Sequence, residues 1–258
     1  MSLAPIFEVQ NLHLQQGAKV LCRDLNLQVL PGQIWVLLGA NGTGKTTLLN
    51  SLAGLFTPAA GQIRFLGQPL ASWPRRQLAQ RLGVLQQDQA FAFPASVRQL
   101  VLQGRHPFQS LWRADSAEDQ QRVAEALAQT DLTPLAERPV DQLSGGERQR
   151  LAIASLLTQG APNLLLDEPS NHLDLHYQVR LLEQLVTHCH RQNGTCIASL
   201  HDLNLAARFG THFLLLLGDG EVAAGPAEAL LRDDYLRRVY QHPILKIQDT
   251  QGCAYLPE

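Results

Sequence analysis

The first third of the chain alternates short apolar segments with turn residues. The apolar segments are residues 7–9, 25–29 and 34–38. Runs of this length between Gly- and Pro-containing turns are typical of β-strands. Residues 45–55 instead have the composition of a helix, which Gly54 and Pro58 end. The pattern therefore predicts a strand over 34–38 that leads through a glycine-rich loop into a helix.

The pattern changes between residues 88 and 142. Strand-like runs at 61–66 and up to residue 85 precede this segment, which contains none itself. Ser116 is followed three residues later by Asp119, a capping box that predicts the start of a helix, and apolar residues continue beyond it at helical spacing. We therefore predict a helical insertion over 88–142.

After this insertion, helical and strand-like segments alternate. Helices are predicted over 149–157 and 177–189, and buried strands over 163–166 and 195–200. Strands that alternate with helices favour a mostly parallel sheet with crossover helices. The sequence therefore predicts an α/β fold, and it contains no internal repeat.

Composition narrows the classes of function. The 258 residues suffice for one large α/β domain, and the 21 Lys and Arg against 23 Asp and Glu give no electrostatic footprint for nucleic acid. The four Cys form no C-x-x-C pair, so we expect reduced thiols. The first residues lack the features of a signal peptide, and no apolar run approaches the about 20 residues that span a bilayer. We expect a cytoplasmic protein that reaches a membrane only through a partner.

The loop after residues 34–38 carries the clearest chemical signal. Its pattern is G-x-x-x-x-G-K-T, in which the glycines let backbone N–H groups turn toward a polyphosphate and the lysine reaches the terminal phosphates. The helix that follows adds the positive end of its dipole. The expected nucleotide-binding residues are Gly39, Ala40, Asn41, Gly42, Thr43, Gly44, Lys45, Thr46 and Thr47.

Two adjacent carboxylates, Asp167 and Glu168, end the apolar strand at 163–166. Ligands gather at the carboxyl edge of a parallel sheet. We expect Asp167 to hold Mg²⁺ together with Thr46, and Glu168 to orient or deprotonate an attacking water. An ordinary polar turn is the alternative for such a pair, and the phosphate loop favours the catalytic interpretation.

The segment 143–147, LSGGE, gives the chain its most specific resemblance. Ser144 and Glu147 form a capping box, and Gly145 and Gly146 leave a bare helix N-terminus. With this segment, the phosphate loop and the acidic pair, the chain resembles the nucleotide-binding subunits of ABC transporters. The resemblance covers nearly the whole chain. The resemblance implies a P-loop NTPase core with a mostly parallel sheet, an N-terminal antiparallel β subdomain and a helical insertion. The implied division of the single domain 1–258 is a catalytic core at 1–87 and 143–240, a helical subdomain at 88–142 and a short C-terminal extension at 241–258.

The resemblance also implies roles for single residues, with ATP as the nucleotide and Mg²⁺ as the metal. Ser144, Gly145 and Gly146 would contact the γ-phosphate of ATP held by a second copy of the chain, in a head-to-tail dimer. Asp174 would lie at the seam of this dimer. Gln87 would sense Mg²⁺ and the γ-phosphate, which His201 would also contact. The expected catalytic residues are Glu168, His201 and Gln87, and the expected metal ligands are Thr46, Gln87 and Asp167.

One position departs from the family's pattern. Family members usually place an aromatic residue near the first strand, where it stacks on adenine, and the matching residue here is Gln16. Aromatic stacking contributes about 1 kcal/mol. We therefore predict weak discrimination between ATP and GTP.

A single cassette without a membrane-spanning segment resembles, within this family, the bacterial importers that use separate permeases. The partners implied are two integral membrane permease subunits and, indirectly, a substrate-binding protein; no nucleic acid is expected. The runs 93–107, 170–174 and 201–206 resemble the group that serves iron-siderophore, haem and cobalamin uptake. The implied location is the cytoplasmic face of the bacterial inner membrane. The alternatives are the ATPase of an exporter or of a molybdate-type importer, and a soluble ABC ATPase of translation or DNA repair.

The segment 88–112 is expected to form part of a groove that faces the permease. Its aromatic residues Phe91, Phe93 and Trp112 have the pattern of exposed contact residues. Packing in the core is the alternative for these three side chains.

Overall fold

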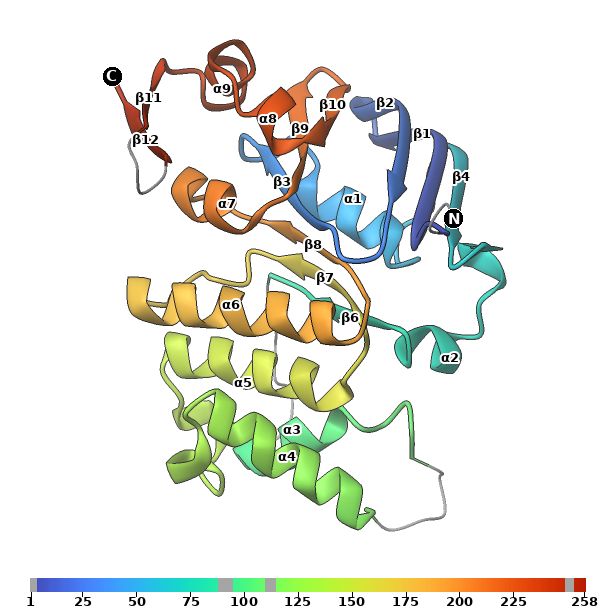
Figure 1. The fold of residues 1–258 in the computed structure, drawn as a ribbon. Helices are drawn as coiled ribbons and strands as arrows, with labels where there is room; N and C mark the ends of the chain where they lie inside the picture. The colour runs from blue at the N-terminus through green and yellow to red at the C-terminus, as the bar shows by residue number, and fades with distance from the viewer. Residues whose placement is uncertain (1–3, 88–94, 110–114, 249–252) are drawn as a thin grey trace.

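The computed structural model describes residues 4–87, 95–109, 115–248 and 253–258. The N-terminal part forms an antiparallel sheet with the strand order β2-β1-β4-β5 (Figure 1). Its strands are β1 (Phe7–Gln16), β2 (Lys19–Val29), β4 (Ala60–Phe65) and β5 (Gln68–Pro69). Alternate residues of β1 are buried, and the rings of Phe7 and Phe65 pack with their centroids 4.9 Å apart. The predicted antiparallel β subdomain is confirmed.

The second sheet has six strands in the order β10-β9-β3-β8-β7-β6. The strands are β3 (Ile34–Gly39), β6 (Leu82–Leu85), β7 (Asn163–Asp167), β8 (Cys196–Ser199), β9 (His212–Gly218) and β10 (Glu221–Pro226). All neighbours pair in parallel except β9 and β10. Every residue of β7 is buried, as expected for a parallel strand covered on both faces. The predicted mostly parallel sheet is therefore confirmed.

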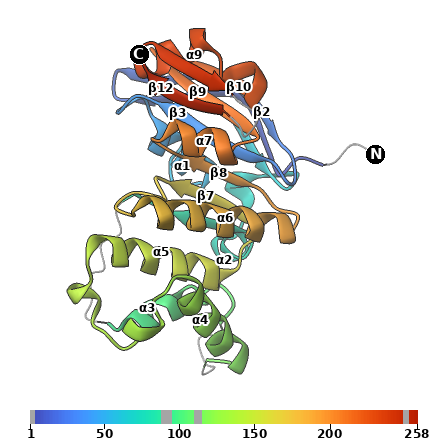
Figure 2. The same ribbon diagram turned by 60° about the vertical axis from the view of Figure 1, so that its left-hand side comes forward.

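Helices cover both faces of this sheet. Helix α1 (Lys45–Leu52) packs between the two sheets, and the other face is covered by α5 (Gly145–Gln159), α6 (Leu175–Arg191), α7 (Leu203–Phe209) and α9 (Asp233–Tyr240) (Figures 1 and 2). Two shorter helices are α2 (Arg75–Ala79) and α8 (Ala227–Leu230). Helix α1 ends at Leu52, before the predicted residue 55, because Gly54 adopts a left-handed φ of 68°.

The described parts of the predicted insertion, residues 95–109 and 115–142, contain helices, as predicted. Helices α3 (Val97–Gln103) and α4 (Ala117–Gln129) pack on α5, at the end of the molecule farthest from the N-terminal sheet (Figure 1). The Ser116 hydroxyl accepts from the Asp119 N–H over 3.1 Å, and Asp119 accepts from the Ser116 N–H over the same distance. The predicted capping box therefore starts α4.

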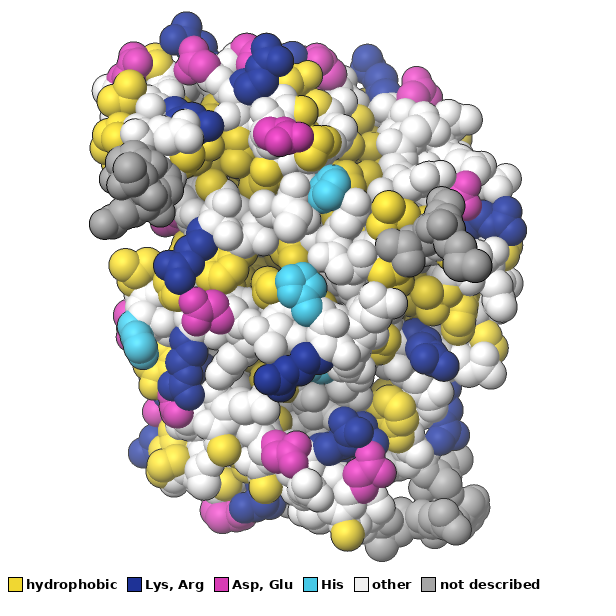
Figure 3. Space-filling model, in the orientation of Figure 1, with side chains coloured by type: hydrophobic (Ala, Val, Ile, Leu, Met, Phe, Trp, Pro, Cys, Tyr) yellow, Lys and Arg dark blue, Asp and Glu magenta, His cyan; other side chains and the backbone are white. Residues whose placement is uncertain are grey.

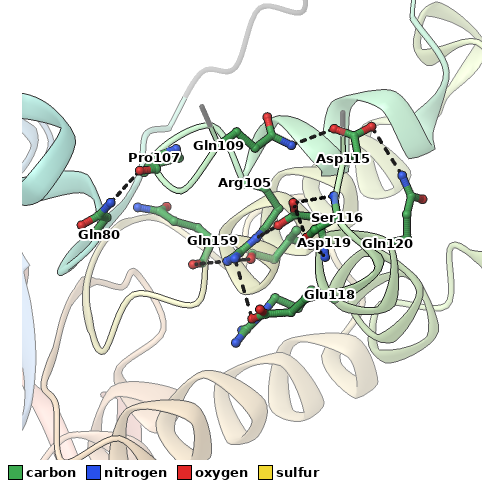
Figure 4. A network of polar contacts seen from close by, with 12 residues as sticks. Gln80, Arg105, Pro107, Gln109, Asp115, Ser116, Glu118, Asp119, Gln120 and Gln159 are labelled. Atoms are coloured by element: carbon green, nitrogen blue, oxygen red, sulfur yellow. Dashed lines mark hydrogen bonds and ion pairs between the residues drawn. The ribbon is translucent and has the colours of Figure 1, made fainter. Parts of the chain in front are cut away.

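A buried arginine joins these helices (Figure 4). Arg105 lies after α3 and its Nε is 2.6 Å from Asp119 Oδ1, at the start of α4. The same guanidinium donates to the Thr158 carbonyl, at the end of α5, over 3.3 Å. Gln80, after α2, donates to the Pro107 carbonyl over 2.7 Å. The helical insertion is therefore attached to the core by polar contacts as well as by apolar packing.

The C-terminal segment forms a hairpin that the sequence did not predict. Strands β11 (Ile244–Gln248) and β12 (Cys253–Pro257) pair antiparallel. Tyr255 is buried, and its backbone exchanges hydrogen bonds of 3.1 and 2.8 Å with the Asn204 side chain of α7. No helix among the described residues is long and apolar enough to span a bilayer.

Candidate functional site

The phosphate loop joins the end of β3 to the start of α1. Gly42 and Gly44 have φ values of 72° and 107°, in the left-handed region that side chains disfavour. A Cβ on Gly44 would lie 2.9 Å from the Leu21 Cβ, so this position also requires the absence of a side chain. Gly44 gives α1 no side-chain cap, so the first-turn N–H groups are free to bind an anion.

Lys45 points into the centre of this loop. It is 6% exposed, and its Nζ donates to the carbonyls of Gly39 and Ala40 over 2.8 and 3.2 Å. Burial lowers the pKa of Lys45, and the nearby charges of Glu168 and Asp167 partly oppose this shift. The ammonium group is therefore held within the loop that is expected to receive the terminal phosphates.

Asp167 links the loop to the carboxyl edge of the sheet. Thr46 Oγ1 donates to Asp167 Oδ2 over 2.5 Å, and Ser199 Oγ donates to Oδ1 over 2.6 Å. A hydroxyl and a carboxylate oxygen in contact are hard donors of the kind that Mg²⁺ uses together with phosphate oxygens. The two residues fit the predicted metal role. No cluster of three or more His, Cys, Asp or Glu in the described parts of the chain could hold a metal by itself.

Glu168 is contacted by side chains from two other segments and by Asn171 of its own turn. Gln87 Nε2 donates to its Oε2 over 2.6 Å, and His201 Nε2 lies 2.5 Å from its Oε1. The Asn171 amide also donates to Oε2. Glu168 is 7% exposed and has a φ of 51°, a strained conformation of the kind that clusters at functional sites. The predicted residues Gln87, Glu168 and His201 therefore meet at one carboxylate.

Asn171 is the member of this cluster that sequence reasoning did not assign. It lies within the run 170–174, which the resemblance singled out without giving Asn171 a role. Residues 168 and 171 are not one helical turn apart, because the backbone at Glu168 has a left-handed φ of 51°. No local signal in the sequence therefore paired Asn171 with Glu168.

The segment 144–146 lies away from the phosphate loop. Ser144 caps α5, with the Glu147 N–H donating to its hydroxyl over 3.3 Å and the Ser144 N–H donating to Glu147 Oε2 over 2.7 Å. The capping box is therefore present, and Ser144 and Gly145 are exposed. Strands β7 and β8 and helix α6 lie between α5 and α1 (Figures 1 and 2). Within the described residues, no hydrogen bond joins this segment to residues 39–46 of the same chain.

Other predicted residues fall at the edges of the site or outside the described residues. Gln16 is exposed and pairs with Lys19 across the β1–β2 hairpin. Asp174 caps α6, accepting from the Tyr177 N–H over 3.0 Å. The permease-facing aromatics Phe91, Phe93 and Trp112 lie outside the residues that the structure describes.

Comparisons with known proteins agree with this geometry. A family model described as ABC transporter matches residues 22–171. The chain is 43% identical over 222 residues to the hemin import ATP-binding protein HmuV of Nocardia farcinica, covering 86% of this chain and 76% of that protein. It is 36% identical over 241 residues to the ferric enterobactin transport ATP-binding protein FepC of Escherichia coli, covering 93% and 89%.

The fold has solved counterparts as well. An ABC transporter described as of the metal-chelate type, solved in an inward-facing conformation, matches with a TM-score of 0.83 and 28% identity, covering 99% of this chain and 98% of that chain. These findings confirm the resemblance that the motifs gave. The chain belongs to the ABC transporter family.

Proposed function

We propose that this chain is the ATP-hydrolysing subunit of a bacterial importer for iron-siderophore complexes or haem, with cobalamin as a further member of the same substrate group. The observation that carries the proposal is the meeting of Gln87, Asn171 and His201 on Glu168, beside the loop that holds Lys45. The import proteins for hemin and ferric enterobactin that the chain resembles support the substrate class. They also favour an importer over an exporter or a molybdate-type system.

The arrangement suits hydrolysis of a nucleoside triphosphate. The free N–H groups of α1 and the ammonium of Lys45 bind the β- and γ-phosphates. Thr46 and Asp167, with Gln87, are the residues that would hold Mg²⁺, which neutralises phosphate charge when bound. Glu168 accepts a proton from the attacking water, while His201 and Asn171 fix the orientation of its carboxylate.

A complete site requires a second copy. Ser144, Gly145 and Gly146 form an exposed helix N-terminus that can meet an anion, yet sheet strands separate it from the chain's own loop. We therefore assign these residues to the γ-phosphate bound by the partner subunit in a head-to-tail dimer. Asp174, which starts α6, lies at the seam of that dimer.

We assign the catalytic core to residues 1–87 and 143–240. The helical subdomain at 88–142 is the part that we expect to contact the permease. Arg76 of α2 donates to the Pro107 carbonyl over 2.9 Å, so Pro107, within the segment 88–112, lies against the core near α2. A groove that faces two membrane permeases would bring the subunit to the cytoplasmic face of the inner membrane. On the face in Figure 3, basic and acidic side chains are interspersed, which disfavours a nucleic-acid partner.

The test uses a tagged Glu168→Gln variant, which retains the site but lacks the carboxylate that accepts the proton. It is purified from detergent-solubilised native membranes with ATP and Mg²⁺, and its companions are identified by mass spectrometry. The proposal expects a many-helix permease in near-equal amount. A Lys45→Ala variant, which is expected not to bind ATP productively, is the control that shows which companions depend on bound ATP.

The outcomes separate the parts of the proposal. A permease together with a substrate-binding protein that binds ferric siderophore or haem supports the importer. Recovery from the soluble fraction, or with ribosomes, contradicts it. A permease whose companion binds molybdate contradicts the substrate class only.

A further inference from the structure

The β1–β2 hairpin reaches the phosphate loop through a lysine. Lys19 is the first residue of β2 and pairs with Gln16, the last residue of β1. Its Nζ donates to the Gly42 carbonyl over 2.7 Å. A Cβ on Gly42 would lie 3.8 Å from this Nζ. The ammonium group therefore lies directly against the loop that receives the nucleotide.

The alternation of side chains along β2 explains why Lys19 contacts the phosphate loop. Side chains two residues apart on a strand point to the same face. Leu21 Cβ lies 2.9 Å from the place of a Cβ on Gly44, so the face that Lys19 and Leu21 share is turned toward the loop. Leu21 is 5% exposed, whereas Lys19 is exposed. Lys19 therefore lies at the solvent-exposed side of the loop.

Most of the hydrogen-bonding capacity of Lys19 is unused. An ammonium group has three donors, and the Gly42 carbonyl is the hydrogen-bond partner of Lys19 in the described parts of the chain. No carboxylate of the described residues forms an ion pair with it. An exposed cation without a carboxylate, at the mouth of an anion-binding loop, attracts a negatively charged ligand.

We infer that Lys19 binds a phosphate oxygen of the bound nucleotide, and that this charge contact takes the place of the base-stacking contact that Gln16 cannot make. The inference rests on the proposed function, since it assumes that a nucleoside triphosphate occupies the loop. A phosphate contact is the same for every base. The affinity that Lys19 contributes is therefore equal for ATP and GTP, which a stacking residue would not ensure.

The alternative to a phosphate contact is a purely structural role, in which Lys19 only fixes the Gly42 peptide. The two roles predict different kinetics. Distortion of the loop would also displace Lys45, which follows it by three residues in the same turn. It would therefore lower kcat together with affinity. Loss of a phosphate contact that is equal in the ground and transition states raises KM and leaves kcat within about twofold.

The experiment measures the Kd of ATP and of GTP by titration calorimetry on the full chain, and KM and kcat for hydrolysis of each. Lys19→Met removes the charge at nearly constant length, and Lys19→Arg retains it. Lys246→Met is the matched control, because Lys246 lies on β11 in the C-terminal hairpin. Thermal unfolding of each variant checks that it is folded.

We expect Lys19→Met to raise Kd and KM about tenfold for both nucleotides, Lys19→Arg to restore them to within about threefold, and Lys246→Met to match the wild type. Unchanged Kd values in Lys19→Met overturn the inference, as does a loss confined to ATP, which would indicate contact with the base. A parallel fall in kcat that Lys19→Arg does not rescue overturns it in favour of loop positioning. A wild-type protein that binds no ATP contradicts the proposed function instead.

Discussion

Replacing Asp119 by Asn removes one charge from a buried ion pair. Arg105 and Asp119 are 2.6 Å apart, and their side chains are 6% and 8% exposed. Asp119 also accepts hydrogen bonds from the Ser116 N–H and hydroxyl over 3.1 and 2.8 Å. Removing one partner of a buried pair costs about 3–5 kcal/mol, because the other charge stays buried. Since Asn keeps one acceptor oxygen, we expect Asp119→Asn to lower the free energy of unfolding by about 3 kcal/mol.

The neighbouring residue provides a matched control. Glu118 lies 4.0 Å from the same guanidinium, but its side chain is 66% exposed. Glu118→Gln removes the same charge one residue away, and we expect it to cost less than about 1 kcal/mol. Urea unfolding at pH 7 followed by circular dichroism measures both variants. Free energies of unfolding within about 1 kcal/mol of each other would refute the view that the buried pair attaches the helical insertion.

The same pair predicts a pH dependence. Burial alone would raise the pKa of Asp119, but hydrogen bonds from Arg105 and Ser116 outweigh burial and lower the pKa below its ordinary 3.8. A lowered folded-state pKa means that the carboxylate stabilises the fold fully above the ordinary value and loses this contribution as the pH falls through the folded value. The stability difference between wild type and Asp119→Asn should therefore be constant at neutral pH and shrink below about pH 4.

Changes at the phosphate loop and at the aromatic residues of 88–112 have different expected effects. Lys45→Ala should abolish ATP binding measured by titration calorimetry, because it removes the cation inside the loop. Glu168→Gln should lower kcat of hydrolysis about 10²–10⁴-fold and retain ATP binding, as expected for loss of a proton acceptor. Wild-type Kd values for ATP and GTP should be similar, and a strong ATP preference would contradict the assignment of Gln16. Replacing both Phe91 and Phe93 should abolish transport in reconstituted vesicles and spare basal ATPase activity; intact transport would refute their role.

Elements set by local pattern were predictable from the sequence. The strand, loop and helix around Lys45 follow from short-range chemistry, and so do the capping boxes at Ser116 and Ser144. The hairpin β11–β12 was not predicted, because most residues of both strands are exposed and the sequence shows no alternation of buried and exposed positions. In β12 only Tyr255 is buried. A two-stranded hairpin of this kind is stabilised by packing against α7, which the local sequence does not reveal.

The sequence predicted which residues form the site, but it did not predict all the contacts between their side chains. The ends of parallel strands meet at one edge of a sheet, so Asp167 and the loop could be expected to lie together. The placement of Asn171 on Glu168 depends on the left-handed turn at Glu168, and the contact of Lys19 with Gly42 depends on how the two sheets pack. Such distances follow from tertiary structure, and motif spacing gives no measure of them.

One short segment, residues 169–172, contacts both the start of α5 and Glu168. Gln149, on the first turns of α5, donates to the Pro169 carbonyl over 2.8 Å, and two residues later Asn171 donates to Glu168. A Cβ on Gly146 would lie 3.1 Å from the His172 carbonyl, so the start of α5 also packs closely on this segment. In the head-to-tail dimer proposed above, a shift of α5 on meeting the partner's nucleotide would therefore act on the same residues that orient Glu168. Since each chain would supply one part of both sites in that dimer, we expect these contacts to couple the occupancy of one site to the carboxylate of the other.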